Sequence, residues 1–236
     1  MLRRSVAEFI GTALLLAAIV GSGIMAQRLS QHDIGLELLE NDLATACALV
    51  AIILALGPVS GAHLNPVITL VDRAFGGLSS KVTVVYIAAQ VAGGVAGSIG
   101  ANLMFGLPAV YISHRTRGAD LWLAEAIATF GLVLVVFGVV RSGRGWLAPF
   151  AVGAYIGAAY FFTASTSFAN PAVTIARTLS DTFTGIAPGS VPGFVLSQAV
   201  GGFAALVVIR LLYPSVAEVA NRVVVPAASE TYGQGS

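Results

Sequence analysis

The sequence predicts an all-α membrane protein with six transmembrane helices and two re-entrant half-helices, arranged as an inverted repeat. The first observation is composition: 57% of the 236 residues are hydrophobic and only 10% are charged, whereas a soluble domain carries about 25% charged residues. The second is a pair of Asn-Pro steps that interrupt apolar sequence, Asn65-Pro66-Val67 and Asn170-Pro171-Ala172. The third is that these steps occupy matching places in two similar halves of the chain.

Six apolar stretches account for the transmembrane helices, since crossing a bilayer takes about 20 residues. They cover residues 6–26, 43–56, 82–105, 121–140, 146–162 and 191–212. The first follows Arg3 and Arg4, as in a signal peptide, but it is longer than the apolar part of a signal, so we interpret it as a retained helix. The second and fifth are short because each continues into a segment rich in small residues, 57–64 or 163–169, and then into an Asn-Pro step.

Each Asn-Pro step predicts the start of a half-helix, because Asn is a favourable N-cap and Pro a favourable first helical residue. The apolar stretches that follow end near Phe75 and Ser180, too soon to cross a bilayer. Lipid cannot satisfy the free N–H groups of a helix start, so both breaks must face a protein cavity or a water-filled path. Two facing half-helices at mid-membrane are typical of a pore or a transport site.

The two halves of the chain repeat three features in the same order. Ala7-Glu8-Phe9 recurs as Ala124-Glu125-Ala126, the first Asn-Pro step recurs as the second, and residues 86–94 recur as residues 194–202. With three spans per half, the second copy enters the membrane from the opposite side. We therefore expect one domain at residues 1–213, with repeats at about 4–106 and 121–213, followed by a mobile tail at 214–236.

Charge and cysteine content limit the partners of the chain. The net charge is +1, which gives no reason to expect a nucleic-acid partner. The single Cys47 excludes an internal disulfide and a multi-cysteine metal site, and no cofactor or metal is expected. Lys and Arg near the span ends number eight on the side of the N-terminus and four on the other side, which predicts that both termini are cytoplasmic.

The chain contains motifs of a known family. The segments Ser60-Gly61-Ala62-His63-Leu64-Asn65-Pro66 and Ala169-Asn170-Pro171-Ala172, with the paired Glu8 and Glu125, resemble the aquaporins and glycerol facilitators, the major intrinsic proteins. The resemblance extends from about Arg4 to Tyr213. It implies a passive channel for small uncharged solutes, assembled as a homotetramer in the lipid bilayer of a bacterial inner membrane. An ion-coupled secondary transporter is the alternative, since inverted repeats and broken helices occur there too. An enzyme is not expected, because the sequence lacks a Ser/His or acidic pair at catalytic spacing.

The resemblance also assigns residues to the pore. Asn65 and Asn170 would each hold an N–H donor at its centre, beside Pro66, Val67, Pro171 and Ala172. The segments before each Asn would turn backbone carbonyls into the path: Gly61, Ala62, His63 and Leu64 on one side, and Thr166, Ser167 and Phe168 on the other. For His63 we expect the side chain to be wedged in the loop, with only its carbonyl in the pore.

Glu8 and Glu125 are ionisable groups inside predicted spans, which suggests a function by default. Proton relay or ion binding is one interpretation. In the other, each carboxylate accepts hydrogen bonds from the adjacent pore loop and holds its shape. The symmetric placement of the two residues and the family resemblance favour the structural role.

The outer filter departs from the family's pattern. Water-selective members have an Arg three residues after the second Asn, and this chain has Val173 there. Counting by the family's spacing without gaps places Thr45, Ala158 and Ser167 at the other filter positions, which predicts a wide opening with little charge. Arg177 lies one turn beyond Val173, and it either leans back to replace the lost charge, lies in the outer vestibule, or pairs with Asp181. We favour the vestibule.

The segment Asn-Pro-Ala-Val-Thr-Ile-Ala-Arg, with Val at the filter position, resembles a group of bacterial aquaglyceroporins encoded with arsenic-resistance genes. The resemblance implies permeation of neutral trivalent arsenic hydroxides in addition to glycerol-like polyols and water. These hydroxides are uncharged near neutral pH and similar in size to polyols, so they suit a wide, uncharged filter.

Overall fold

The computed structural model describes residues 1–213, and the tail expected at 214–236 lies outside them. Over the described range the chain is helical, with six helices long and apolar enough to cross a membrane and two half-helices, which confirms the predicted fold class. The long helices are α1 (Leu2–Leu29), α2 (Ile34–Ser60), α4 (Ser80–Met104), α5 (Trp122–Arg141), α6 (Ala148–Phe162) and α8 (Val191–Leu212). The half-helices are α3 (Pro66–Ala74) and α7 (Pro171–Ala176), and a 3₁₀ turn at Arg177–Leu179 extends α7.

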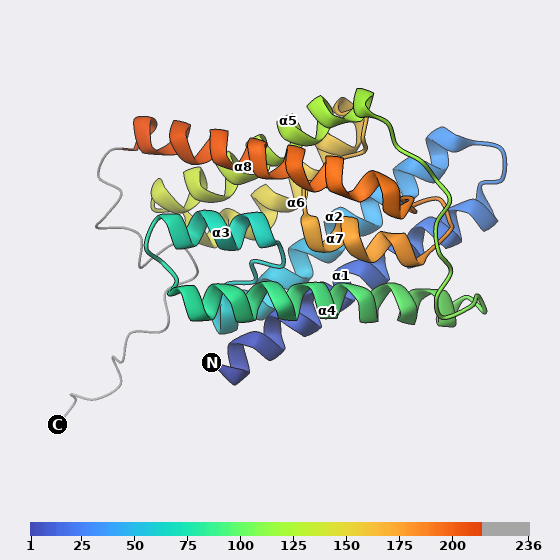
Figure 1. The fold of residues 1–236 in the computed structure, drawn as a ribbon, viewed down its shortest axis with the longest axis horizontal. Helices are drawn as coiled ribbons and strands as arrows, with labels where there is room; N and C mark the ends of the chain where they lie inside the picture. Colours follow the sequence, from blue (N-terminus) through green and yellow to red (C-terminus); the bar gives the residue numbers. More distant parts are fainter. Residues whose placement is uncertain (214–236) are drawn as a thin grey trace.

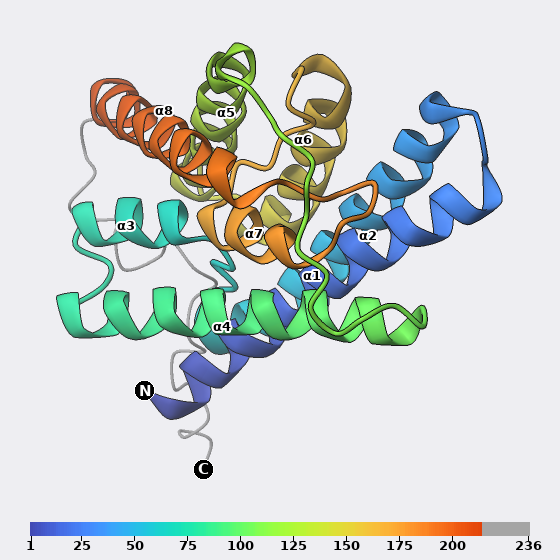
Figure 2. The ribbon, with the colours of Figure 1, turned by 45° about the vertical axis from the view of Figure 1, so that its right-hand side comes forward.

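The long helices form an elongated bundle that surrounds the half-helices (Figure 1). α1 packs against α2 and α4, α5 packs against α6 and α8, and α2 against α6 joins the two halves. We call the end with the α1–α2 turn and the long α4–α5 connection the loop end, and the opposite end, with Met1, the N-terminal end. α3 lies toward the N-terminal end and α7 toward the loop end, and their first residues meet in mid-bundle (Figures 1 and 2).

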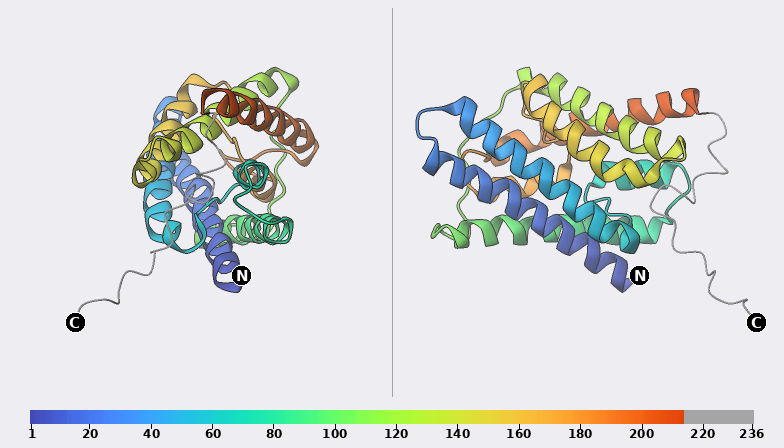
Figure 3. Two further views of the ribbon diagram at one scale, coloured as in Figure 1. Left: turned by 90° about the vertical axis from the view of Figure 1, so that its left-hand side faces the viewer. Right: turned by 180° about the vertical axis from the view of Figure 1, so that it is seen from behind.

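The second helix is longer than predicted. α2 begins at Ile34, before the apolar stretch, and continues through Pro58 to Ser60, so residues 57–60 belong to the helix and not to the extended segment. Two causes explain the longer start: the Asp33 side chain caps the helix by accepting a hydrogen bond from Leu36 N at 3.0 Å, and Asn41 is buried with its side chain donating to Ile19 O at 2.9 Å. The view from behind in Figure 3 shows α1 and α2 side by side along most of their length.

Glycines allow the tightest helix contacts in both halves. A Cβ at Gly93 would overlap the carbonyl oxygen of Phe9, and a Cβ at Gly201 would overlap that of Ala126. These two contacts are equivalent in the repeat, since Gly93 and Gly201 lie on α4 and α8 while their partners lie on α1 and α5. Close backbone approach at small residues is how helices pack in membranes, where burial of apolar surface adds little.

Candidate pore

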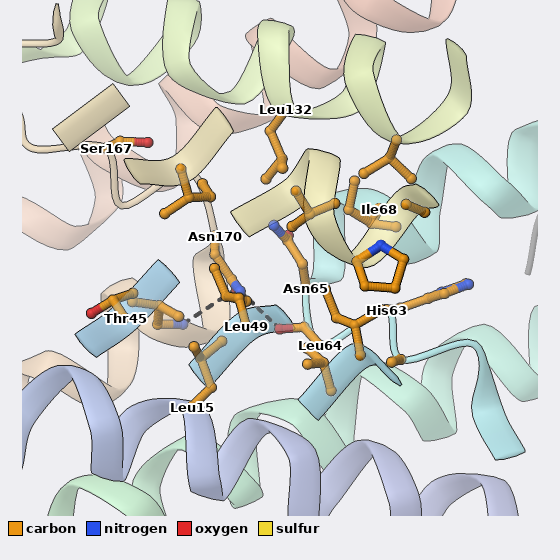
Figure 4. Close-up of a pocket in the computed structure, with 18 of the residues that line it drawn as sticks. Leu15, Thr45, Leu49, His63, Leu64, Asn65, Ile68, Leu132, Ser167 and Asn170 are labelled. Atoms are coloured by element: carbon orange, nitrogen blue, oxygen red, sulfur yellow. Dashed lines mark hydrogen bonds between the residues drawn. The ribbon is translucent and has the colours of Figure 1, made fainter. Parts of the chain in front are cut away.

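The two predicted caps meet at the centre of the bundle. The side-chain oxygen of Asn65 accepts from Val67 N at 2.9 Å, and that of Asn170 accepts from Ala172 N at 2.9 Å, so each Asn caps its own half-helix. The amide nitrogens cross between the halves: Asn65 Nδ2 donates to Ala169 O and Asn170 Nδ2 donates to Leu64 O, both at 2.8 Å. An amide nitrogen has two hydrogens, so each Asn keeps one donor for the cavity that both residues line (Figure 4).

The segments before the two Asn residues have matching backbone conformations. Gly61, Ala62 and Leu64 have φ values of 97°, 46° and 51°, and the residues at the same offsets in the second half are also left-handed: Thr166, Ser167 and Ala169, at 62°, 50° and 48°. This conformation is uncommon for residues with a Cβ, and it clusters at functional sites where surrounding contacts stabilise it. The repeat is therefore preserved in the backbone, although the side chains differ.

Most of the residues expected to present carbonyls line the cavity. Gly61, Ala62, His63, Leu64, Ser167 and Phe168 are in its wall, whereas Thr166 is not. The carbonyl of Leu64 is engaged by the Asn170 amide. The carbonyl of Ala169, which the sequence analysis did not assign, holds the Asn65 amide in the same way.

Glu8 and Glu125 are fully buried against the pore loops. The Glu8 carboxylate accepts from His63 N at 3.0 Å and Leu64 N at 2.8 Å. That of Glu125 accepts from the equivalent loop amides, Phe168 N at 2.9 Å and Ala169 N at 3.0 Å. A glutamine completes each site: Gln90 Nε2 donates to Glu8 at 2.7 Å and Gln198 Nε2 to Glu125 at 2.6 Å. These hydrogen bonds favour the structural interpretation, in which each carboxylate holds the shape of the adjacent pore loop.

Glu8→Gln and Glu125→Gln are each expected to lower the yield of folded protein more than they change solute selectivity. A Gln amide turns donors toward the loop N–H groups, and each buried polar group left unpaired costs about 1–3 kcal/mol. The monodisperse fraction in detergent and the glycerol-to-water flux ratio measure the two effects. Asp33→Asn, at the exposed cap of α2, is the control and should change neither. Well-folded Gln variants with altered dependence on an ion gradient would contradict the structural role.

The His63 ring is buried beside the first loop. Its Nδ1 lies 3.2 Å from Thr69 Oγ1, and the ring meets Tyr86 edge-on at a centroid distance of 5.6 Å. The second ring nitrogen lies 3.9 Å from the Asp72 carboxylate. His63 therefore marks the N-terminal side of the Asn pair, and Thr45 and Ser167 mark the loop side (Figure 4).

One of the four predicted filter positions is wrong. Thr45, Ser167 and Val173 are buried and line the cavity near the loop end, but Ala158 is exposed on the outer surface of α6. Ile156 and Tyr160 line the cavity in its place. A shift of two residues rotates a side chain by about 200° around a helix, so the gapless count pointed to the opposite face.

The cavity wall at the predicted filter therefore contains an aromatic residue that the gapless count missed. Tyr160 is buried, and its hydroxyl donates to Thr45 Oγ1 at 3.3 Å, which joins α6 to α2 across the cavity wall. The signal that could have found it is the spacing of four residues between Ile156 and Tyr160, which puts both on one helix face.

The preferred placement of Arg177 in a vestibule is also wrong. Arg177 is only 3% exposed and lines the same cavity as Val173. Its guanidinium carbon lies 3.5 Å from the centre of the Phe168 ring, and its Nε donates to Thr184 O. Asp181 is not its partner: it accepts from the backbone N and ring Nδ1 of His114, both at 3.0 Å, and these hydrogen bonds hold the pKa of Asp181 below its usual value.

Two oppositely directed half-helices that meet at a cavity inside a helical bundle are typical of one class of membrane channels. Comparison with known proteins identifies the family. Residues 1–169 match the family model described as Major intrinsic protein. The chain is 49% identical over 215 residues to the aquaglyceroporin AqpS of Rhizobium meliloti (strain 1021), across 90% of this chain and 91% of that protein. It is 34% identical over 181 residues to aquaporin NIP1-3 of Oryza sativa subsp. japonica, across 73% and 62% of the two chains. The chain belongs to the major intrinsic protein family.

The solved structures support the same fold. The X-ray structure of the aquaglyceroporin from Plasmodium falciparum superposes with a TM-score of 0.73 at 22% sequence identity, covering 91% of this chain and 98% of that one. At this identity the match concerns the arrangement of helices, which agrees with the six spans and two half-helices described above.

Proposed function

We propose that this protein is a passive transmembrane channel for small uncharged solutes: water, glycerol-like polyols and neutral trivalent metalloid hydroxides such as arsenite. The observation that carries the proposal is the meeting of Asn65 and Asn170, each of which keeps an amide donor for one continuous cavity. Similarity to AqpS, which is described as an aquaglyceroporin, supports polyols and water as solutes.

The cavity wall is suited to solutes that are polar on one side. Apolar side chains from α1, α2 and α5, such as Leu15, Leu49 and Leu132, line the same cavity as the Asn pair and the loops (Figure 4). A hydroxyl oxygen accepts hydrogen bonds from the amides while the carbon face of a polyol contacts the leucines. Each half-helix also turns a positive end of about +0.5 charge toward the centre, which opposes the passage of cations.

The proposal that arsenite passes through the channel depends on the residues at the predicted filter. Val173 leaves the cavity near the loop end without a bulky group at that turn of α7, and Thr45 and Ser167 supply hydroxyls. Ser167 Oγ is buried and has no hydrogen-bond partner in the described part of the chain, so no protein group in that part competes for this hydroxyl. A neutral hydroxide of arsenic presents the same donor and acceptor groups as a polyol.

Flux into proteoliposomes tests the proposal. Stopped-flow light scattering with water, glycerol, urea and arsenous acid should show rates above those of empty liposomes. The rates should not change when Na⁺ and proton gradients are collapsed, because a channel needs no driving ion. Solute uptake that requires either gradient would overturn the channel in favour of an ion-coupled transporter.

The buried carboxylate of Asp42 favours an ion-coupled transporter as a second candidate function. Because α2 begins at Ile34, Asp42 lies inside a helix that spans the membrane, where it is 8% exposed. Its Oδ1 has no partner among residues 1–213, unlike the saturated carboxylate oxygens of Glu8 and Glu125. If an ion is coupled to transport, Asp42→Asn should abolish the gradient dependence; in a passive channel it should leave solute flux unchanged.

We further propose a homotetramer in a bacterial inner membrane, with both termini cytoplasmic. The excess of Lys and Arg at the N-terminal end supports the orientation, and the family resemblance supports the assembly. The loop end, with Val173 and Arg177, then faces outward. Native mass spectrometry of the protein in nanodiscs checks the subunit number, and an N-terminal reporter fusion checks the orientation.

A further inference from the structure

We infer that Arg177 determines the charge selectivity of this pore and Val173 determines its width. Charge selectivity and width are thus controlled by two residues on successive turns. This inference rests on the proposed channel function and adds the residues that determine its specificity. Val173 and Arg177 are four residues apart on α7 and its 3₁₀ extension, and both line the cavity. Residues with this spacing lie on one helix face, one above the other.

The side chain of Arg177 is held in place by contacts on two sides. Its guanidinium stacks at 3.5 Å on the Phe168 ring, and its Nε donates to the carbonyl of Thr184. Phe168 is itself packed edge-on against Phe194, at a centroid distance of 5.3 Å. Thr184 is fully buried, and it packs so closely on α1 that a Cβ at Gly23 would overlap it. These contacts therefore fix the position of the Arg177 guanidinium in the cavity wall.

A second guanidinium shares the Phe168 ring. Arg117, from the long connection between α4 and α5, has its guanidinium carbon 4.8 Å from the ring centre and donates weakly to Ser165 O and Gly185 O at 3.4 Å. Burial lowers the pKa of Arg117. Proximity to Glu125 opposes this shift, and proximity to Arg115 adds to it. Arg117 is only partly buried and is not in the cavity wall, so it adds positive charge near the Phe168 ring without lining the cavity.

Among residues 1–213, no carboxylate forms an ion pair with the guanidinium of Arg177. In the described range 1–213 the close pairs of a basic and an acidic side chain are His63 with Asp72 and His114 with Asp181. The one hydrogen bond of the Arg177 side chain to a described residue uses Nε. A guanidinium has five N–H donors, so those on the two terminal nitrogens remain for water or solute in the cavity.

This arrangement separates exclusion of cations from restriction of size. A buried positive charge repels a cation or a hydrated proton strongly, because the effective dielectric constant is low. The same donors bind the oxygen of a neutral hydroxylated solute. Since the guanidinium is drawn onto Phe168 and Thr184, the turn at Val173 is left open for a solute wider than water.

The experiment compares four variants in proteoliposomes: Arg177→Ala, Arg177→Lys, Phe168→Leu and the double variant Val173→Arg/Arg177→Ala. Glycerol flux is measured by light scattering, and proton and Na⁺ leak by a pH dye and a potential-sensitive dye. Arg177→Ala should raise proton or Na⁺ leak by about tenfold, and should change this leak more than it changes glycerol flux, because a buried unit charge is removed. Arg177→Lys should keep the ion leak low. Phe168→Leu should give part of the increase in ion leak, because it removes the ring on which the guanidinium stacks.

The double variant and a matched control complete the test. Moving the guanidinium to position 173 should return leak toward the wild-type value while lowering glycerol flux. Arg28→Gln is the control, because Arg28 also lies on an aromatic ring at the loop end, 5.0 Å from the centre of Phe105, but is exposed and outside the cavity wall. It should change neither quantity.

The outcomes separate this inference from the proposed function. Wild-type protein without passive solute flux would overturn both. Passive flux in the wild type, together with unchanged ion leak in an Arg177→Ala variant that still conducts glycerol, would overturn the role of Arg177 alone. Retained glycerol flux shows that the variant is folded; if Arg177→Ala is not, Phe168→Leu and the double variant decide the question.

Discussion

Val173→Arg is expected to reduce the flux of glycerol and arsenous acid about tenfold or more, equivalent to about 1.4 kcal/mol of added barrier. Val173 is 3% exposed in the cavity wall near Thr45, Tyr160 and Arg177, so the longer side chain must enter the cavity. It also brings a further cation next to Arg177, and repulsion from the two guanidiniums already at the Phe168 ring disfavours withdrawal of the new side chain toward that ring. Water is small and accepts hydrogen bonds from Arg, so its flux should fall much less.

Val173→Leu is the control for bulk without charge. It adds one methylene group to the same turn and should lower glycerol flux by a smaller factor, with the ratio of water to glycerol flux between those of the wild type and the Arg variant. Stopped-flow measurements on one set of reconstituted proteins give all three ratios. Unchanged glycerol flux in Val173→Arg would show that residue 173 does not lie at the constriction.

Gly97→Ala is expected to destabilise the protein by about 1–3 kcal/mol, the usual cost of overpacking. A Cβ at Gly97 would overlap the carbonyl oxygen of Ala13 and lie 2.9 Å from Leu16 Cβ. The first neighbour is backbone, so relief requires α1 and α4 to move apart. This pair also holds Glu8 and Gln90, which support the first pore loop.

Gly100→Ala is the matched control on the same helix. A Cβ there meets nothing within 4 Å, and Ala is favoured over Gly in a helix by about 1 kcal/mol. The fraction of monodisperse protein that survives heating in detergent should therefore fall for Gly97→Ala and stay level or rise for Gly100→Ala. Equal survival of the two variants would contradict the close packing of α1 on α4.

The sequence by itself determined the fold class and the two half-helix starts that meet in the bundle. Six apolar stretches and two Asn-Pro steps predict spans and half-helices through local physics, because lipid leaves no other way to satisfy the backbone. Asn65 and Asn170 cap the helices that follow them, as local sequence predicts. The start of α2 was missed because Asn41 and Asp42 break the apolar pattern; both are buried by other helices in the bundle, which no local pattern shows.

Only the tertiary structure decided which residues line the cavity at the predicted filter. Which residues of α6 face the cavity depends on the rotation of that helix against α2 and α5, and a count along the chain cannot determine it. Tyr160 therefore replaced Ala158 in the wall. The place of Arg177 depends on a ring that precedes it by nine residues and a carbonyl that follows it by seven. A long cation can extend in several directions from its helix, and the packed side chains and backbone around it determine which direction it takes.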